Sequence, residues 1–271
     1  MNKKSHFVKC LLLFVSLAFV FVMLVLPLAV VLIKSLEEGW LAYRTTVTDY
    51  YTQKALGLTL TATIIATVLN TIFGLFAAWA ITKFNFRFKN ALTTIIDLPF
   101  AISPIIAGLI FIMTFGRIGF LHPFLQAHHI KIVFATPGIV LATLFVTFPF
   151  VAREIIPLMN SQGNEEEEAA AMMGANGFTI FFKVTLPKIK WALIYGIILC
   201  AARAMGEFGA VSVVSGSIRG KTNTLPLHVE ILYNEFKATE AFGVASILVI
   251  MAIVILILRN IIEYRSRRES E

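Results

Sequence analysis

Three ionisable residues, Arg203, Glu207 and Asp97, lie inside long apolar stretches of the sequence. Arg203 and Glu207 are four residues apart, so they share one face if the segment is helical. Ionisable groups at membrane depth normally face a bundle interior or a water-filled cavity. The pattern therefore predicts a polar element of a pathway or gate. The alternative for Arg203 and Glu207 is a neutralising pair that locks helices together, and for Asp97 it is a buried structural partner.

Two hydroxyl side chains follow the charged pair, Ser215 and Ser217, on either side of Gly216. Hydroxyls and the backbone amides of a turn can hold an oxyanion by hydrogen bonds without burying a full positive charge. We therefore expect Ser215 and Ser217 to contribute to a substrate pathway. The alternative is an ordinary loop on the outer side of a membrane.

The sequence lacks the residue patterns of common hydrolytic and metal-dependent enzymes. The apolar stretches contain no convincing Ser/His, Cys/His or HExxH arrangement. Cys10 and Cys200 lie in apolar runs without neighbouring metal ligands, and His128 and His129 are better explained as loop residues. The sequence also has no G-x-x-x-x-G-K-[ST] phosphate loop. We expect no catalytic residue, metal or cofactor, so an ATP-driven role requires a partner that binds ATP.

The composition is typical of a protein that crosses a lipid bilayer several times. Hydrophobic residues make up 58% and charged residues 14% of the 271 positions, which is far from the averages of soluble proteins. Stretches of about twenty apolar residues predict an all-α, polytopic membrane protein with six transmembrane helices. These helices are expected at residues 10–33, 58–82, 91–115, 135–158, 191–214 and 241–262.

The basic residues predict the orientation of the chain. The formal charge of +7 does not indicate a nucleic-acid partner, because membrane topology explains the Lys and Arg residues. With the N-terminus in the cytoplasm, 14 of them fall on the cytoplasmic side and 8 on the other. This predicts that both termini are cytoplasmic, and the resemblance given below implies the bacterial cytoplasmic membrane. We expect a first helix with an outer loop (1–57), a five-helix core with a cytoplasmic loop (58–262, loop 159–190), and a cytoplasmic tail (263–271).

The cytoplasmic loop has a dense pattern of its own. Asn164 and Glu167 have the spacing of a capping box, so a helix is expected to start there. Four acids at 165–168 suit the N-terminal end of a helix, and Gly174 permits a sharp turn. Pro187 is expected to stop a second short helix. The predicted product is a helix–turn–helix knob that fits the cleft of another protein. A plain polar loop is the alternative.

The order of residues in this loop resembles the EAA loop in the membrane subunits of ABC importers. The residues that carry the resemblance are Glu168, Ala169, Ala170, Gly174, Leu186 and Pro187. Val184 stands where that family usually has Ile, a mild departure. The resemblance implies a type I ABC importer permease fold. It also implies that Glu168, Ala169, Ala170 and Gly174 dock onto cytosolic ATPase subunits and couple the chain to them. Leu186 and Pro187 mark the end of this motif.

Three further runs resemble the permeases of sulfate and thiosulfate importers. They are DLPFAISP at 97–104, FPFVARE at 148–154 and ARAMGEFGAVSVVSGSIRG at 202–220, and the part from 206 onward is most similar to the W-type subunit. The resemblance covers roughly residues 55–262. It implies a homologous T-type permease as partner, two cytoplasmic ABC ATPase subunits that bind the ATP, and an extracytoplasmic sulfate- or thiosulfate-binding protein.

Other transport functions and one enzymatic function remain as alternatives. Molybdate and tungstate permeases are close relatives of this family. Molybdate differs from sulfate mainly in size and hydration, so one sequence does not separate these substrates. A stand-alone secondary transporter would be expected to carry internal inverted repeats, and none is evident in the sequence. An intramembrane enzyme lacks its catalytic residues. Co-purification with an ATPase would separate the importer from the other two classes.

Overall fold

The computed structural model describes residues 3–270 of the chain, and side chains for residues 8–265. All regular structure in this part is helical, as the composition predicts. The elements are α1 (Lys3–Val20), η1 (Phe21–Val25), α2 (Leu26–Ser35), α3 (Trp40–Thr48), α4 (Tyr50–Lys83), α5 (Lys89–Ala101), α6 (Pro104–Phe115), α7 (His122–Ala127), α8 (Thr136–Thr147), α9 (Pro149–Gln162), α10 (Glu165–Met172), α11 (Gly177–Ile180), η2 (Phe181–Thr185), α12 (Leu186–Met205), α13 (Gly209–Ser215), α14 (Leu225–Asn234) and α15 (Ala238–Ser270).

Five continuous helical segments are long and apolar enough to cross a membrane. They are Val8–Ser35, Tyr50–Lys83, Thr136–Gln162, Gly177–Met205 and Ala238–Arg265. The pair α5 and α6 gives a sixth crossing if it is counted as one span, although its two halves are bent by 109°. The last helix continues through most of the predicted tail, and Glu271 lies outside the described residues.

The predicted third span, residues 91–115, is not a continuous helix. α5 ends at Ala101, Ile102 is extended, and Ser103 adopts a ψ of 133° before Pro104 opens α6. A residue that precedes proline is pushed out of the helical region by the pyrrolidine ring. The helix therefore breaks and turns at this position.

The predicted fifth span, residues 191–214, is also wrong in its boundaries. α12 ends at Met205, and a separate helix, α13, starts at Gly209. At the other end the helix does not stop at Pro187, which occupies the first turn of α12 after the π-helical turn η2. Proline is tolerated in a first turn because its missing N–H has no intrahelical partner there. The loop predicted at 159–190 is therefore shorter in the structure, because its residues from Leu186 onward belong to the spanning helix α12.

The long helix α4 lies at the centre of the bundle and packs against α8, α9 and α12. Small residues make this close packing possible, because they let helix backbones approach within the membrane. Ala66 and Ala78 are fully buried, and a Cβ added at Gly74 would lie 3.1 Å from the Cβ of Val151. Asn70 adds polar contacts, since its amide nitrogen donates to Thr147 Oγ1 at 2.8 Å.

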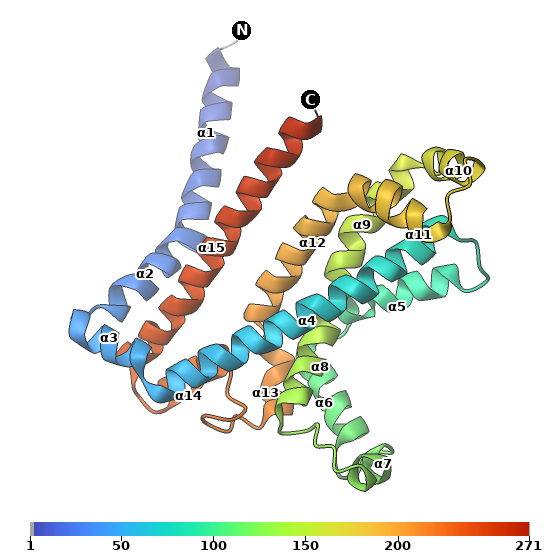
Figure 1. Cartoon of the computed structure of the whole chain (residues 1–271). Coiled ribbons are helices and arrows are strands. Elements are labelled where there is room, and N and C mark those ends of the chain that lie inside the picture. Colours follow the sequence, from blue (N-terminus) through green and yellow to red (C-terminus); the bar gives the residue numbers. More distant parts are fainter. Residues whose placement is uncertain (1–2, 271) are drawn as a thin grey trace.

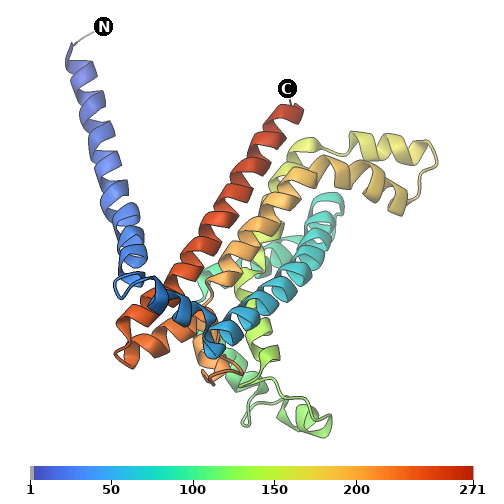
Figure 2. The same cartoon turned by 60° about the vertical axis from the view of Figure 1, so that its left-hand side comes forward.

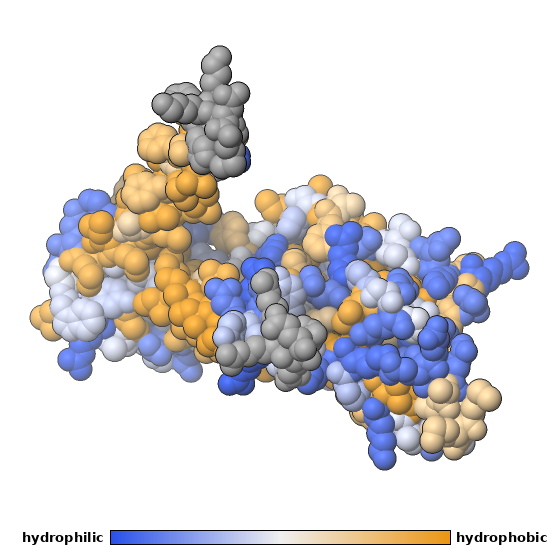
Figure 3. Space-filling view, turned by 90° about the horizontal axis from the view of Figure 1, so that it is seen from above, coloured by the Kyte–Doolittle hydropathy of each residue, from blue (hydrophilic) through white to orange (hydrophobic). Residues whose placement is uncertain are grey.

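The ends of the bundle differ in what they carry. The start of α1 and the end of α15 lie at the same end as α10 and α11, here called the loop end (Figure 1, Figure 2). α3, α7 and α14 lie at the opposite end. Viewed onto the loop end, hydrophilic side chains gather over the part that carries α10 and α11, and apolar side chains cover the N-terminal helix (Figure 3).

Candidate functional site

The loop end carries a helix–turn–helix segment, as the sequence predicts. α10 is followed by a turn in which Gly174 has a φ of +86°, and α11 begins three residues later. Nothing lies within 4 Å of a Cβ built on Gly174. The glycine is therefore required by the backbone conformation and not by lack of space. Asn176 caps α11, since its side-chain oxygen accepts from the backbone N–H of Thr179 at 2.8 Å.

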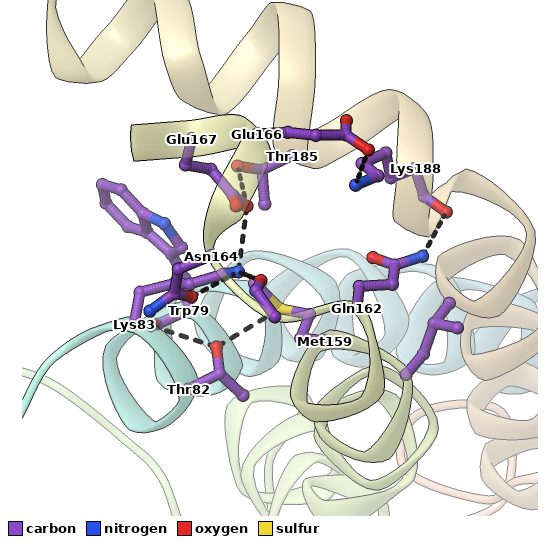
Figure 4. A network of polar contacts seen from close by, with 12 residues as sticks. Trp79, Thr82, Lys83, Met159, Gln162, Asn164, Glu166, Glu167, Thr185 and Lys188 are labelled. Atoms are coloured by element: carbon purple, nitrogen blue, oxygen red, sulfur yellow. Dashed lines mark hydrogen bonds and ion pairs between the residues drawn. The ribbon is translucent and has the colours of Figure 1, made fainter. Parts of the chain in front are cut away.

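The acids of α10 do not form the predicted capping box. Asn164 precedes α10, but its side chain makes no capping hydrogen bond there. The Glu167 carboxylate lies 2.9 Å from Lys83 Nζ and accepts a hydrogen bond from Thr185 Oγ1 at 3.2 Å (Figure 4). Burial alone would raise the pKa of Glu167, but the Lys83 ammonium and the Thr185 hydroxyl outweigh it and lower the pKa below its usual value. The carboxylate is therefore charged at neutral pH.

The remaining acids of α10 are all exposed. Glu166 pairs with Lys188 at 2.6 Å, and Glu165 and Glu168 face solvent. Of the residues in the EAA-like motif, Ala169 is also exposed and Ala170 is half-buried. Leu186 packs beside the core around Ile155 and Ile189, away from the tip. Glu168 and Ala169 are thus accessible at the surface, whereas Leu186 packs in the bundle and Pro187 beside it is exposed.

The tip of the segment holds apolar residues that sequence reasoning did not single out. Met172 is 91% and Met173 is 87% exposed, and Phe178 on the other side of the turn is also exposed. Exposed apolar side chains surrounded by polar ones are typical of surfaces that contact a protein or a membrane. The signal in the sequence was a pair of methionines in a loop otherwise rich in charge. Methionine adapts its flexible thioether to irregular partner surfaces.

Arg203 and Glu207 form the neutralising ion pair that was the alternative to a pathway role, but they do not share one helix. Arg203 Nη1 lies 2.6 Å from Glu207 Oε2, and the Glu207 side chain is only 1% exposed. Glu207 lies between α12 and α13, and its other oxygen accepts from the backbone N–H of Ala210 at 2.9 Å. The pair therefore holds the first turn of α13 against the last turn of α12.

The two breaks in the membrane helices lie side by side. A Cβ added to Gly209, the first residue of α13, would come within 2.9 Å of the Cβ of Pro104, the first residue of α6. A Cβ on Gly108 would lie 2.7 Å from the carbonyl oxygen of Ala210. Irregular backbone at membrane depth is tolerated where it is buried in protein or lines a cavity.

The other predicted pathway residues have separate partners. Asp97 on α5 accepts from Arg153 Nε on α9 at 2.8 Å, and both side chains are more than one-third exposed. The buried Ser215 hydroxyl accepts from the backbone N–H of Ser217 at 3.0 Å, and Ser217 has a φ of 49°. In this conformation Ser215 therefore stabilises a tight turn. In the part of the chain that the structure describes, Asp97, Arg203 and Ser215 bond to different partners and not to one another.

Comparison with known proteins identifies both a family and close relatives. Residues 70–270 match the family described as binding-protein-dependent transport system inner membrane component. The sulfate transport system permease protein CysW of Synechococcus elongatus is 47% identical over 94% of this chain and 90% of its own length. CysW of Escherichia coli strain K12 is 43% identical over 92% and 85%. The corresponding CysT of Salmonella typhimurium is 35% identical over 93% and 91%.

Solved structures agree with the fold. The structure of a bacterial ABC transporter involved in import of the acidic polysaccharide alginate superposes with a TM-score of 0.79, over 99% of this chain and 98% of that chain. The same score is found for an alginate transporter in complex with a periplasmic protein bound to an alginate pentasaccharide. Sequence identities of 15% and 16% limit these matches to the fold. The arrangement of helices is that of ABC importer permeases.

Proposed function

The chain belongs to the family of binding-protein-dependent transport system inner membrane components, and we propose that it is a membrane subunit of an ATP-driven sulfate importer. Support for sulfate comes from relatives at 43–47% identity that are named as sulfate permeases. The single observation that carries the coupling role is the bent segment α10–α11, with Glu168 and Ala169 exposed beside the apolar tip. Such a segment fits a cleft of an ATPase subunit, which would bind and hydrolyse the ATP.

The other subunits of the importer are proposed from the family match and the named relatives. The similarity to CysT relatives supports a homologous T-type permease as the second half of the conduit. Two cytoplasmic ATPase subunits would dock at the loop end, and an extracytoplasmic binding protein would deliver the anion at the opposite end. The excess of Lys and Arg at the loop end supports a cytoplasmic position for that end and for both termini. The chain itself would perform no covalent chemistry.

The two adjoining helix breaks are the best candidate for a gate. Glu207 and Arg203 hold one break, and Pro104 opens the other. A neutralised ion pair beside broken helices can repack between discrete arrangements, as switching elements do. Arg203 and Glu207 would then set the gate, with Asp97 on α5 between that gate and the loop end. The hydroxyls of Ser215 and Ser217 would meet the anion only if their turn opens.

Glycine substitutions test the coupling role of the bend. We expect Gly174→Val to lower sulfate uptake roughly tenfold, because a left-handed backbone costs a residue with a Cβ about 1–2 kcal/mol. The matched control is Gly177→Val, since Gly177 also has open space but no positive φ. Uptake of labelled sulfate is measured in cells with equal amounts of membrane protein.

Three results would contradict the proposal. Wild-type uptake in Gly174→Val would remove the bend from the mechanism. Failure of an ATPase to co-purify with the wild-type chain would exclude an ABC importer. Uptake of molybdate or tungstate in preference to sulfate, in direct competition, would reassign the substrate.

A further inference from the structure

Lys83, the last residue of α4, makes an unusually complete set of contacts at the loop end. Its ammonium donates to the backbone oxygen of Gly163 at 2.7 Å and to Asn164 Oδ1 at 2.9 Å. Its third contact is the ion pair with Glu167 Oε1 at 2.9 Å. A lysine ammonium has three N–H donors and no acceptor. Each donor therefore has one acceptor (Figure 4).

These three acceptors tie different parts of the chain to one helix end. Gly163 and Asn164 form the link between α9 and α10, and Glu167 lies in the first turn of α10. Glu167 in turn accepts from Thr185 at the end of η2, so the contact extends to the start of α12. α4 then runs through the bundle in contact with α8, α9 and α12. Lys83 is the point where the coupling segment meets the central helix.

Burial distinguishes this contact from the neighbouring ion pair. The side chains of Lys83 and Glu167 are 10% and 15% exposed, whereas Glu166, paired with Lys188, is 61% exposed. Ion pairs in solvent contribute little because water and salt screen them. Removing one member of a well-buried pair leaves the other charge without compensation. Of these two ion pairs, the Lys83 contact is the one able to hold α10 in a fixed position.

We propose that Lys83 is a positioning residue that fixes the coupling segment to the end of α4, so that a displacement of α10 moves α4 with it. The inference rests on the proposed coupling to an ATPase, and nothing in the family comparison assigns a role to this lysine. A rigid connection is needed because a displacement passes between packed elements only if they move as one body.

Lys83→Met tests the proposal, because methionine retains an unbranched apolar side chain and removes all three donors. In the purified importer with its ATPase subunits in nanodiscs, we expect stimulation of ATP hydrolysis by sulfate-loaded binding protein to fall about tenfold, the size expected from lost charged hydrogen bonds. The amount of assembled complex should stay close to wild type. Arg87→Met, which removes the same charge from an exposed position in the neighbouring loop, is the matched control.

A double substitution separates positioning from general stability. If Lys83 acts through Glu167, the variant Lys83→Met/Glu167→Gln should be no more impaired than Lys83→Met alone. A purely structural lysine would instead lower complex yield and hydrolysis together and leave the ratio of transport to hydrolysis unchanged. Full stimulation in Lys83→Met, or equal loss in Arg87→Met, would overturn the inference. An ATPase that never associates with the wild-type chain would refute the proposed function itself.

Discussion

The two ends of α4 are held by contacts of opposite character. At the loop end, Lys83 forms an ionic contact with a segment that projects from the bundle. At the opposite end, neutral groups meet α14 in the protein interior. Thr59 Oγ1 accepts from the backbone N–H of Leu225 at 2.8 Å, and Thr52 Oγ1 lies 3.3 Å from His228 Nε2. The same helix thus ends in a polar, partly accessible junction on one side and a buried one on the other.

The lowered pKa of His228 is consistent with a neutral, buried contact at this end of α4. Its side chain is buried, and Asn223 Nδ2 lies 3.1 Å from its Nδ1. Burial lowers the pKa of His228, the positive charge of Arg219 lowers it further, and Asp49, Glu235 and Glu240 oppose the effect without reversing it. The imidazole is therefore neutral at physiological pH. The neutral, buried contacts at the His228 end therefore anchor α4, whereas the ionic contact at Lys83 is where we propose that a movement is transmitted.

The largest effect on the anchoring end is expected from Thr59→Val, which keeps the shape of the side chain and removes the acceptor for Leu225. A buried donor without a partner costs about 1–3 kcal/mol, so the thermal unfolding temperature in detergent should fall. The control is Thr61→Val, because Thr61 is exposed and bonds only to Gly57 of its own helix. Transport per hydrolysed ATP should not change. A loss of coupling at unchanged stability would contradict the assignment of roles to the two ends.

A smaller effect is expected from pH at the same end. Because folding lowers the pKa of His228, the unfolded chain binds the proton more readily, and stability is lost as pH falls below the usual histidine value of about 6.5. The unfolding temperature should therefore drop between pH 7.5 and 5.5, and His228→Gln should reduce the drop. His128→Gln, at an exposed position, should leave it intact. The Lys83–Glu167 contact should be unaffected in this range, since the Glu167 pKa is lowered from 4.5.

The smallest effect is expected from the exposed pair at the loop end. Lys188→Met removes the partner of Glu166, and exposed ion pairs contribute about 0–1 kcal/mol. Uptake and hydrolysis should stay within roughly twofold of wild type. If Lys188→Met lowered uptake and hydrolysis as much as Lys83→Met, the burial of the Lys83–Glu167 pair would not explain its role. The proposed positioning role of Lys83 would then be contradicted.

Much of the fold and part of the site could be predicted from local sequence. Of the six spans predicted from apolar stretches, four are continuous helices in the structure. They could be predicted locally because a helix needs about twenty apolar residues to cross the bilayer, independently of the helices beside it. Gly174 was predicted to turn and does so with a positive φ. The spacing of Arg203 and Glu207 allowed a neutralising ion pair as the alternative to a pathway role, and this pair forms even though the helix ends between them.

The other errors concern where the membrane helices break or begin. The breaks at Ser103 and before Gly209 are packed together, since Gly209 lies against Pro104 and Gly108 lies against Ala210, and spacing along the chain does not record this contact. Pro187 does not end a helix, because the π-helical turn before it places the proline in a first turn.

Composition and short-range spacing were enough to predict a helical membrane protein with a bent, acid-led segment, because they record burial and turns directly. Which acid of that segment is anchored, and to what, depends on how the helices pack. Glu167 meets a lysine from the end of α4 rather than the Asn164 expected to cap with it. The physical reason is that a charge buried at a helix end is compensated by whichever opposite charge the packed helices bring within about 3 Å, and local spacing carries no record of that neighbour.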